Sequence, residues 1–250
     1  MRTSLVPGML NMLAYNLNRA NDNVCLFEAG NVFEAAGSKT VELKRICMGA
    51  TGCVGDSNVH QPPRRYSFFD MKGDVETLLQ LFQHRTLSYD PQTAEYYHPG
   101  RSARAVMDGA KVAQFGQLHP STAAEHRLRQ DVFIAELYLD RLYPHGLRQV
   151  WFESLPRYPA VERDFSFIFS DTTLFEQIRR SVAGLRQSAL RSFVPVEIFR
   201  GGSVPAGKYS LLLRATFQSN ERTLREDEVA QWSAEIIKSL EALGGSLRAA

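Results

Sequence analysis

The stretch ERDFSFIF, residues 162–169, decides the fold of the C-terminal part of this chain. Its three phenylalanines recur at every second position, at Phe165, Phe167 and Phe169. Because side chains alternate between the two faces of a strand, this spacing predicts a strand with one buried aromatic face. Such a face needs a covering layer, so helices are expected to follow.

Two helices are predicted after this strand. Each would begin at a capping-box pattern, a threonine followed three residues later by glutamate: Thr173–Glu176 and Thr223–Glu226. The first helix would bury the apolar stripe of Leu174, Ile178, Val182 and Leu185, and the second that of Val229, Trp232, Ile236, Leu240 and Leu243.

Three further strands complete this part. One passes through Val194, Val196 and Ile198, and the next covers residues 208–218, where alternation points Lys208 and Arg214 away from the core. Gly244-Gly245 would end the second helix before a short strand at 246–248. The resulting order is βαββαβ, that of the ferredoxin-like fold.

The N-terminal part is expected to be an antiparallel α+β domain, because its strands outnumber its helices and are joined mostly by hairpins and loops. Three prolines between residues 144 and 159 indicate a linker, so we place two domains at residues 1–157 and 158–250. The elements predicted before the linker are helices at 5–19 and 69–82, strands at 24–34, 41–52, 103–108, 111–118 and 132–140, a loop at 55–65 and a break at 98–100.

Composition favours a globular cytoplasmic protein. Hydrophobic residues make up 44% and charged residues 22% of the 250 positions, and no apolar run approaches the roughly 20 residues of a membrane span. The N-terminus lacks the features of a signal peptide. The three cysteines have no CxxC spacing and the six histidines no HxxxH spacing, so we predict buried structural thiols and no metal site.

Charge is polarised in the last third of the chain. From Arg179 to Arg225 there are nine basic residues against two acidic ones, and Glu226-Asp227-Glu228 follow directly. The basic stretch could meet phosphate groups. The three acids are favoured in the first turn of a helix by its dipole, so they are not read as an acid/base pair. No phosphate-binding glycine loop and no nucleophile with an evident histidine partner occurs, so no catalytic residue is predicted.

Several segments in the right order resemble one family. YPAVERDFSFIF (158–169), IFRGGSVPAGKYSLLLRATFQSNERTLREDEV (198–229) and GGSLR (244–248) resemble the ferredoxin-fold anticodon-binding domain of the bacterial phenylalanyl-tRNA synthetase beta subunit. RTSLVPGMLNMLAYNLNR (2–19), LFEAGNVFE (26–34), YYHPGRSARAV (96–106) and FGQLHP (115–120) are similar to the catalytic-like module of the same subunit. Glu197 and Phe199 stand where that family commonly has Asp and Tyr.

The resemblance implies a catalytically degenerate domain related to class II synthetases, followed by a tRNA-binding domain. The motif 2 segment LFEAGNVFE holds no arginine and GxGxGxxR is absent, so the cations that activation needs at the nucleotide phosphates are missing. Such a subunit also carries upstream domains, including an editing domain and a metal-binding one, so this chain would be a C-terminal fragment. ATP and magnesium are expected only in the complete ligase, and no cofactor in this chain.

The expected partners are tRNA(Phe) and the catalytic alpha subunit, with which the complete enzyme forms a heterotetramer. An RNA stem presents mainly phosphates and 2′-hydroxyls. The residues we expect to contact it are Arg163, Arg191, Arg200, Lys208 and Arg214. One alternative is an interaction scaffold with incidental RNA binding, and another is a free-standing enzyme with an unrecognised site.

Overall fold

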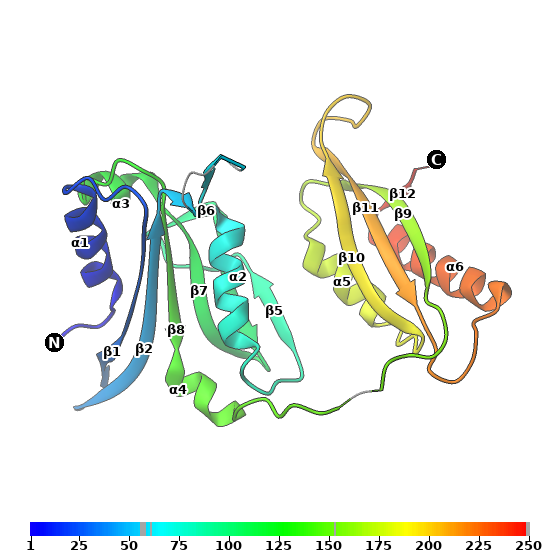
Figure 1. The fold of residues 1–250 in the computed structure, drawn as a ribbon, viewed down its shortest axis with the longest axis horizontal. Coiled ribbons are helices and arrows are strands. Elements are labelled where there is room, and N and C mark those ends of the chain that lie inside the picture. Colours follow the sequence, from blue (N-terminus) through cyan, green and yellow to red (C-terminus); the bar gives the residue numbers. More distant parts are fainter. Residues whose placement is uncertain (56–58, 61, 153, 249–250) are drawn as a thin grey trace. The chain divides into compact units, whose positions relative to one another are not determined.

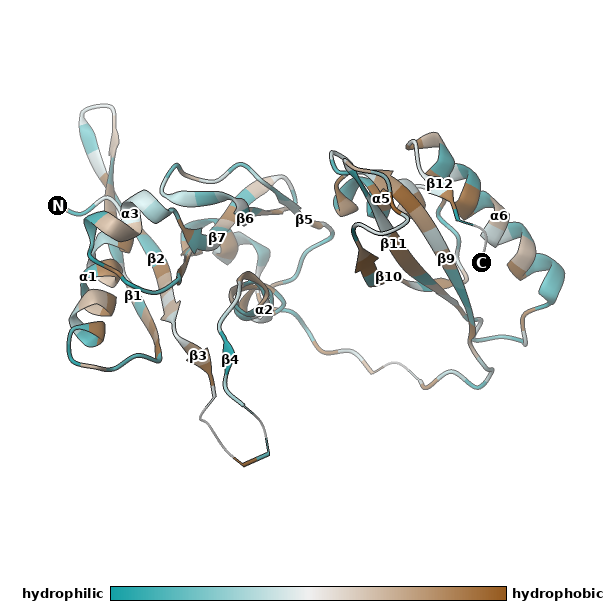
Figure 2. Ribbon diagram, turned by 90° about the horizontal axis from the view of Figure 1, so that it is seen from above, coloured by the Kyte–Doolittle hydropathy of each residue, from teal (hydrophilic) through white to brown (hydrophobic). Residues whose placement is uncertain are grey.

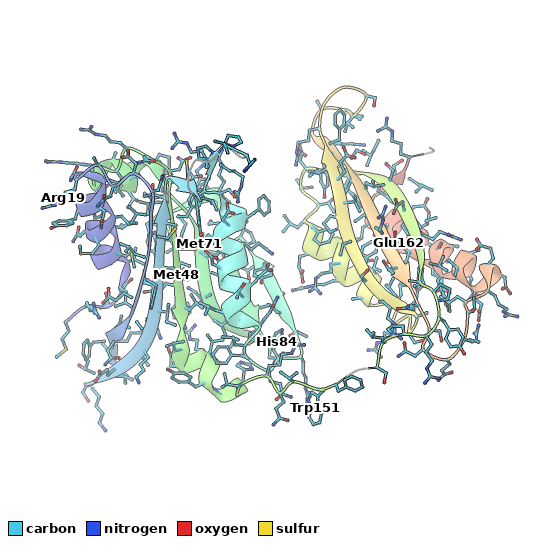
Figure 3. All side chains as sticks on the ribbon, viewed as in Figure 1. Arg19, Met48, Met71, His84, Trp151 and Glu162 are labelled. Atoms are coloured by element: carbon cyan, nitrogen blue, oxygen red, sulfur yellow. The ribbon has the colours of Figure 1, made fainter. Side chains whose placement is uncertain are left out.

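The computed structural model describes residues 1–55, 59–60, 62–152 and 154–248. The chain divides into two compact units, Met1–Val150 and Trp151–Ala250, each with its own sheet (Figure 1). The sequence placed the boundary near Arg157, in the segment between Val150 and the strand that begins at Val161. Trp151, labelled in Figure 3, lies in this segment and is 80% exposed.

Unit 1 is built on a six-stranded sheet in the order β1-β2-β8-β7-β6-β5, with every neighbouring pair antiparallel. Its strands are β1 (Val24–Ala36), β2 (Lys39–Thr51), β5 (Leu87–Asp90), β6 (Tyr97–Met107), β7 (Ala110–Leu118) and β8 (Val132–Tyr138). A small separate hairpin pairs β3 (Cys53–Val54) with β4 (Arg64–Arg65). The helices are α1 (Val6–Leu17), α2 (Phe68–Leu79), α3 (Pro120–Glu125) and α4 (Leu139–Leu142), followed by the 3-10 turn η1 (Tyr143–His145).

Helices cover both faces of this sheet, which explains why all seven residues of β8 are buried. Alternate β8 residues join two different cores. Phe133, Ala135 and Leu137 pack with α2, whereas Val132 and Ile134 pack with α1. Met71 of α2 and Met48 of β2, both labelled in Figure 3, belong to the first core.

The start of α1 is held by a buried carboxylate. Oε1 of Glu136, in β8, accepts hydrogen bonds from Ser4 Oγ at 2.9 Å and from the backbone N–H of Leu5 at 3.3 Å. The Ser4 hydroxyl in turn accepts from the N–H of Val6 at 3.1 Å. These bonds satisfy N–H groups that a helix start leaves without partners, and they compensate for the burial of Glu136.

The prediction for unit 1 identified both long helices and five strands, but other elements differ, and residues 139–140, expected to end a strand, begin α4. β6 continues through residues 98–100, where a break was expected, by means of a register shift between Tyr97 and Ser102. β5 and α3 were not predicted, and Arg64–Arg65 form a strand inside the expected loop, of which residues 56–58 and 61 lie outside the described ones. Of the cysteines, Cys47 is buried as expected, but Cys25 is exposed and Cys53 half-buried.

Unit 2 has the predicted βαββαβ order. Its four-stranded antiparallel sheet runs β10-β11-β9-β12, with α5 and α6 packed on one face. The elements are β9 (Val161–Ser170), α5 (Phe175–Ala183), β10 (Leu190–Phe199), β11 (Lys208–Phe217), α6 (Glu226–Ala242) and β12 (Ser246–Leu247). Phe165, Phe167 and Phe169 are buried at 5%, 0% and 0% exposure, which confirms the alternation of β9.

Both helices of unit 2 begin later than predicted, and at each one the side chain three residues after the N-cap accepts a hydrogen bond from the N-cap N–H. Gln177 Oε1 accepts from the N–H of Leu174 at 2.8 Å, and Leu174 is 48% exposed rather than part of the buried stripe. At α6, Glu228 accepts from the N–H of Arg225 at 3.1 Å. The guanidinium of Arg222, hydrogen-bonded to the same carboxylate, lowers the pKa of Glu228 to about 2.

Three aliphatic side chains of the edge strand β10 are exposed. Val194, Val196 and Ile198 are 44%, 48% and 58% exposed, and the end of β10 is coloured hydrophobic in Figure 2. Pro195 lies in the middle of the strand, and the pairing with β11 shifts by one residue directly after it. An edge strand tolerates proline because its nitrogen can face solvent.

We predict that residues 158–250 fold without unit 1, because the whole core of unit 2 lies between Val161 and Leu240. A sample of this segment should show one cooperative thermal transition by circular dichroism. Replacing the fully buried Phe167 with alanine should lower the free energy of unfolding by about 3–5 kcal/mol, whereas Lys238→Ala on the exposed side of α6 should leave it nearly unchanged. A non-cooperative melt of the unmodified segment would contradict the prediction.

Candidate nucleic-acid interface

The open face of the unit 2 sheet lies opposite its two helices. Strand register fixes its members, because Arg214 pairs with Asp164 and Lys208 with Ser170 in the β11–β9 ladder. Arg214 and Lys208 therefore share this face, as the sequence predicted. A hollow of about 410 Å³ is present on it. It is lined by Ser166, Glu197, Phe199, Ser203, Ser210, Leu212 and Arg248.

Arg214 is held by carboxylates of the neighbouring strand. Its Nε and Nη2 donate to the two carboxylate oxygens of Asp164 at 2.8 Å each, and Nη1 lies 3.2 Å from Glu162. This two-pronged geometry is the strongest form of an arginine–carboxylate pair. The same contact lowers the pKa of Asp164. Arg214 can meet an RNA phosphate only by sharing or leaving these partners.

Arg163 and Arg200 are also paired with acids. Arg163 lies on the helix face of β9, where Nη2 donates to Glu226 at 2.5 Å, so strand alternation removes it from the open face. Arg200 pairs with Asp171 and stacks over the ring of Tyr209, 5.1 Å from its centroid. Both guanidiniums remain partly exposed, at 35% and 55%.

The two other predicted residues make no ion pair among the described part of the chain. Lys208 is exposed at the first position of β11. Arg191, also exposed, donates from Nε to the carbonyl oxygen of Gln218 at 3.2 Å. Lys208 and Arg191 are thus the predicted cations whose charge is least neutralised within the protein.

Arg248 was not predicted from the sequence. This residue follows β12, and its Nη2 donates to Ser203 Oγ at 3.1 Å at the rim of the open-face hollow. Glycines at 244 and 245 followed by a short strand were the available signal. They do not reveal which loop the arginine would reach.

Some cations on the sheet of unit 1 are held by acids and aromatic rings. The buried Arg45 pairs with Glu34 and Asp140 and stacks on Tyr138, and Arg104 forms a two-pronged pair with Asp90. Burial lowers the pKa of Lys111, and the nearby positive charges of Arg141 and Arg104 lower it further. Within the described residues, no group of His, Cys, Asp and Glu is placed to hold a metal ion, and no helix is long and apolar enough to cross a membrane.

Comparison with known proteins gives two family matches. Residues 1–139 match the phenylalanyl tRNA synthetase beta chain CLM domain, and residues 156–248 match the ferredoxin-fold anticodon binding domain. A helix-covered antiparallel sheet followed by a ferredoxin-fold anticodon-binding domain defines the class, that of the aminoacyl-tRNA synthetases and their subunits. The first match alone spans more than half of the chain. The chain belongs to the family of phenylalanyl-tRNA synthetase beta chains.

Curated relatives align along almost the whole chain. The phenylalanine–tRNA ligase beta subunit of Carboxydothermus hydrogenoformans is 28% identical over 98% of this chain and 31% of that subunit. The same subunit of Legionella pneumophila is 30% identical over 96% of this chain and 30% of its own length. The chain therefore spans about 31% of the length of the relatives it matches. A pyrrolysyl tRNA synthetase of Desulfitobacterium hafniense superposes with a TM-score of 0.41 at 12% identity, over 57% of this chain and 48% of its own.

The Arg214–Asp164 pair predicts a pH effect. Since the folded-state pKa of Asp164 is lowered, the pair stabilises the fold above the ordinary carboxyl pKa, and this contribution disappears as pH falls through the lowered value. In an Arg214→Gln variant, carbon NMR should show the pKa of Asp164 rising toward the ordinary value. Arg200→Gln, which removes a cation from Asp171 instead, should leave Asp164 unchanged. An unchanged Asp164 titration in Arg214→Gln would show that the pair does not form in solution.

Proposed function

We propose that this chain is a non-catalytic part of a phenylalanine–tRNA ligase beta subunit that binds the anticodon stem region of tRNA(Phe) through unit 2. The observation that carries the proposal is the match of residues 156–248 to an anticodon-binding domain, together with the sheet that leaves one face open. The relatives bear the name of the beta subunit of this ligase, which supports the same assignment.

The mode of binding follows from the chemistry of an RNA stem. Its narrow major groove hides base edges, so a protein meets phosphates and 2′-hydroxyls. Of the five predicted cations, Lys208 and Arg191 can bind phosphate without giving up an ion-pair partner within the described residues. Arg163, Arg200 and Arg214 can contribute by exchanging an exposed carboxylate for a phosphate, an exchange whose net gain is smaller because an existing pair is lost.

Unit 1 is assigned the task of packing on the catalytic alpha subunit. Large apolar side chains at its surface support this assignment, since Phe27 and Phe69 are 76% and 77% exposed. We assign no autonomous catalysis to the chain, and ATP and magnesium to the complete cytoplasmic ligase. An interaction scaffold with incidental RNA binding is the alternative that the same exposed residues favour.

The test is the salt dependence of tRNA(Phe) binding by the 250-residue chain, measured by fluorescence anisotropy. Each phosphate contact releases counterions, so Lys208→Ala should weaken binding and lower the log–log slope by roughly one unit. Arg214→Ala should have a smaller effect, because Asp164 and Glu162 already neutralise its charge.

Lys238→Ala is the matched control. Lys238 is an exposed lysine of unit 2 on α6, between Glu235 and Glu241, and should not approach phosphate. Equal losses at Lys208 and Lys238 would show that only net charge matters. Binding that appears only when the alpha subunit is added would favour the scaffold.

A further inference from the structure

Lys111, the second residue of β7, is a half-buried lysine of unit 1 that lies among arginines. Its Nζ donates to Oε1 of Gln114 at 3.1 Å and lies 4.9 Å from the centroid of the Tyr138 ring. Within the described residues it forms no ion pair, whereas Lys72, the other half-buried lysine, pairs with Glu76. The ammonium form of Lys111 is therefore disfavoured, because water solvates it only in part and no carboxylate neutralises it.

The sheet gathers three more cations around this position. Arg45 of β2 pairs with Tyr138 of β8, and Arg104 of β6 pairs with Gln114 of β7. All four lie on one face, because Gln114 in turn pairs with the residue two positions before Tyr138. The guanidiniums of Arg45 and Arg141 lie 4.5 and 4.8 Å from the centroid of the ring that the lysine also approaches. Three cations thus share one tyrosine ring.

The nearby carboxylates are bound to other groups. Two of them pair with Arg45 and one with Arg104, namely Glu34, Asp140 and Asp90. The buried Glu136 holds the start of α1. Asp140 lies 3.9 Å from Arg141, a long contact that leaves this guanidinium 40% exposed. Nη1 of Arg141 donates to the carbonyl oxygen of Lys111 at 3.0 Å, which fixes this cation beside the lysine.

This environment favours the neutral amine of Lys111. Burial lowers its pKa, and the charges of Arg141 and Arg104 lower it further, while Glu136 acts in the opposite direction. A lysine beside other cations is activated as a nucleophile, because more of it carries a free lone pair at neutral pH. The hydrogen bond to Gln114 uses one N–H of the amine and leaves the lone pair for an electrophile.

We propose that Lys111 is a site of covalent acylation by small acyl phosphates. The amine attacks the carbonyl carbon, a C–N bond forms, and the C–O bond to the phosphate breaks. The phosphate leaves with the electron pair and takes up the proton that the amine releases. The partly exposed Arg141 can stabilise the charge of the leaving phosphate. The amide product is neutral, so the reaction removes one charge from the cation cluster. The proposal does not depend on RNA binding by unit 2.

The experiment treats the 250-residue chain with acetyl phosphate at several pH values and follows each lysine by quantitative peptide mass spectrometry. Lys111 should be acetylated several times faster than Lys238, and its rate should level off at a lower pH. Lys238 is the internal reference because it is exposed on α6. If Lys111 reacts no faster than Lys238, the proposal is wrong.

Two arginine variants test the role of the cations. Arg141→Gln should slow the acetylation of Lys111 and move its pH profile upward, without changing Lys238. Arg19→Gln is the matched control: Arg19, labelled in Figure 3, also stacks on a tyrosine ring, 3.4 Å from the centroid of Tyr15, and also donates to a backbone carbonyl oxygen. It should leave Lys111 unchanged. Equal rates of Lys111 acetylation in the two variants would overturn the proposal.

A third variant and a second acyl donor complete the test. Lys111→Arg keeps the charge and should remove the fast adduct from the intact-mass spectrum, and an adduct that persists would contradict the assignment. The ratio of the Lys111 rate to the Lys238 rate should be larger with acetyl phosphate than with p-nitrophenyl acetate, because only the first donor carries a phosphate that Arg141 attracts. Equal ratios would overturn the assignment to acyl phosphates.

Discussion

The two-residue alternation of β9 is the constraint on which the rest of unit 2 depends. It directs Phe165, Phe167 and Phe169 toward α5 and α6 and leaves the residues between them on the opposite face. A shift of pairing by one residue would expose the phenylalanines and bury Asp164, so the register is strongly fixed. The same alternation decides which cations can reach a ligand together. It separates Arg163 from Arg214, although their backbone positions are adjacent in the β9–β11 ladder.

Unit 1 obeys the same rule on two faces at once. Its central strand β8 is buried throughout because α1 and α2 cover opposite sides of the sheet, so its sequence shows no polar alternation beyond Glu136. That carboxylate is tolerated because Ser4 and the N–H of Leu5 bind it. One buried acid thus links the start of the first helix to the central strand of the sheet. The two residues, Leu5 and Glu136, are 131 positions apart in the sequence.

Periodicity in the sequence predicted most elements, and its failures have physical causes. The phenylalanine spacing identified β9, and the Asp108-Gly109 turn identified the β6–β7 hairpin, where both residues have positive φ. Pro99 and Gly100 resemble a break, yet β6 passes through them. The neighbouring strand β7 can lie close there because Gly116 has no Cβ, and a Cβ at this position would lie only 2.5 Å from the backbone of Ser102. The helix caps were misplaced because Gln177 and Glu228 supply the acceptors, and a threonine pattern does not show which acceptor is in reach.

The candidate interface was less predictable than the fold. Sequence located the basic stretch and the strand faces, but pairing of Arg214 with Asp164 joins residues 50 positions apart. Likewise, the bulge that redirects Arg191 is visible only in the register of β10 against β11. Whether a cation is available or neutralised is a tertiary property, so the five predicted arginines and lysines divide into two kinds that the sequence does not distinguish.

The free edge of β10 has a consequence for how this domain can meet other proteins. An unpaired strand invites a second chain to extend the sheet through main-chain hydrogen bonds. At β10 the nitrogen of Pro195 has no hydrogen to offer, and the shift of register after it breaks the regular spacing of the ladder. Sheet extension is therefore blocked at the centre of the edge. A partner that approaches this edge therefore has to recognise the shape of side chains, namely the exposed valines and isoleucine. It cannot rely on main-chain hydrogen bonds, which do not depend on sequence.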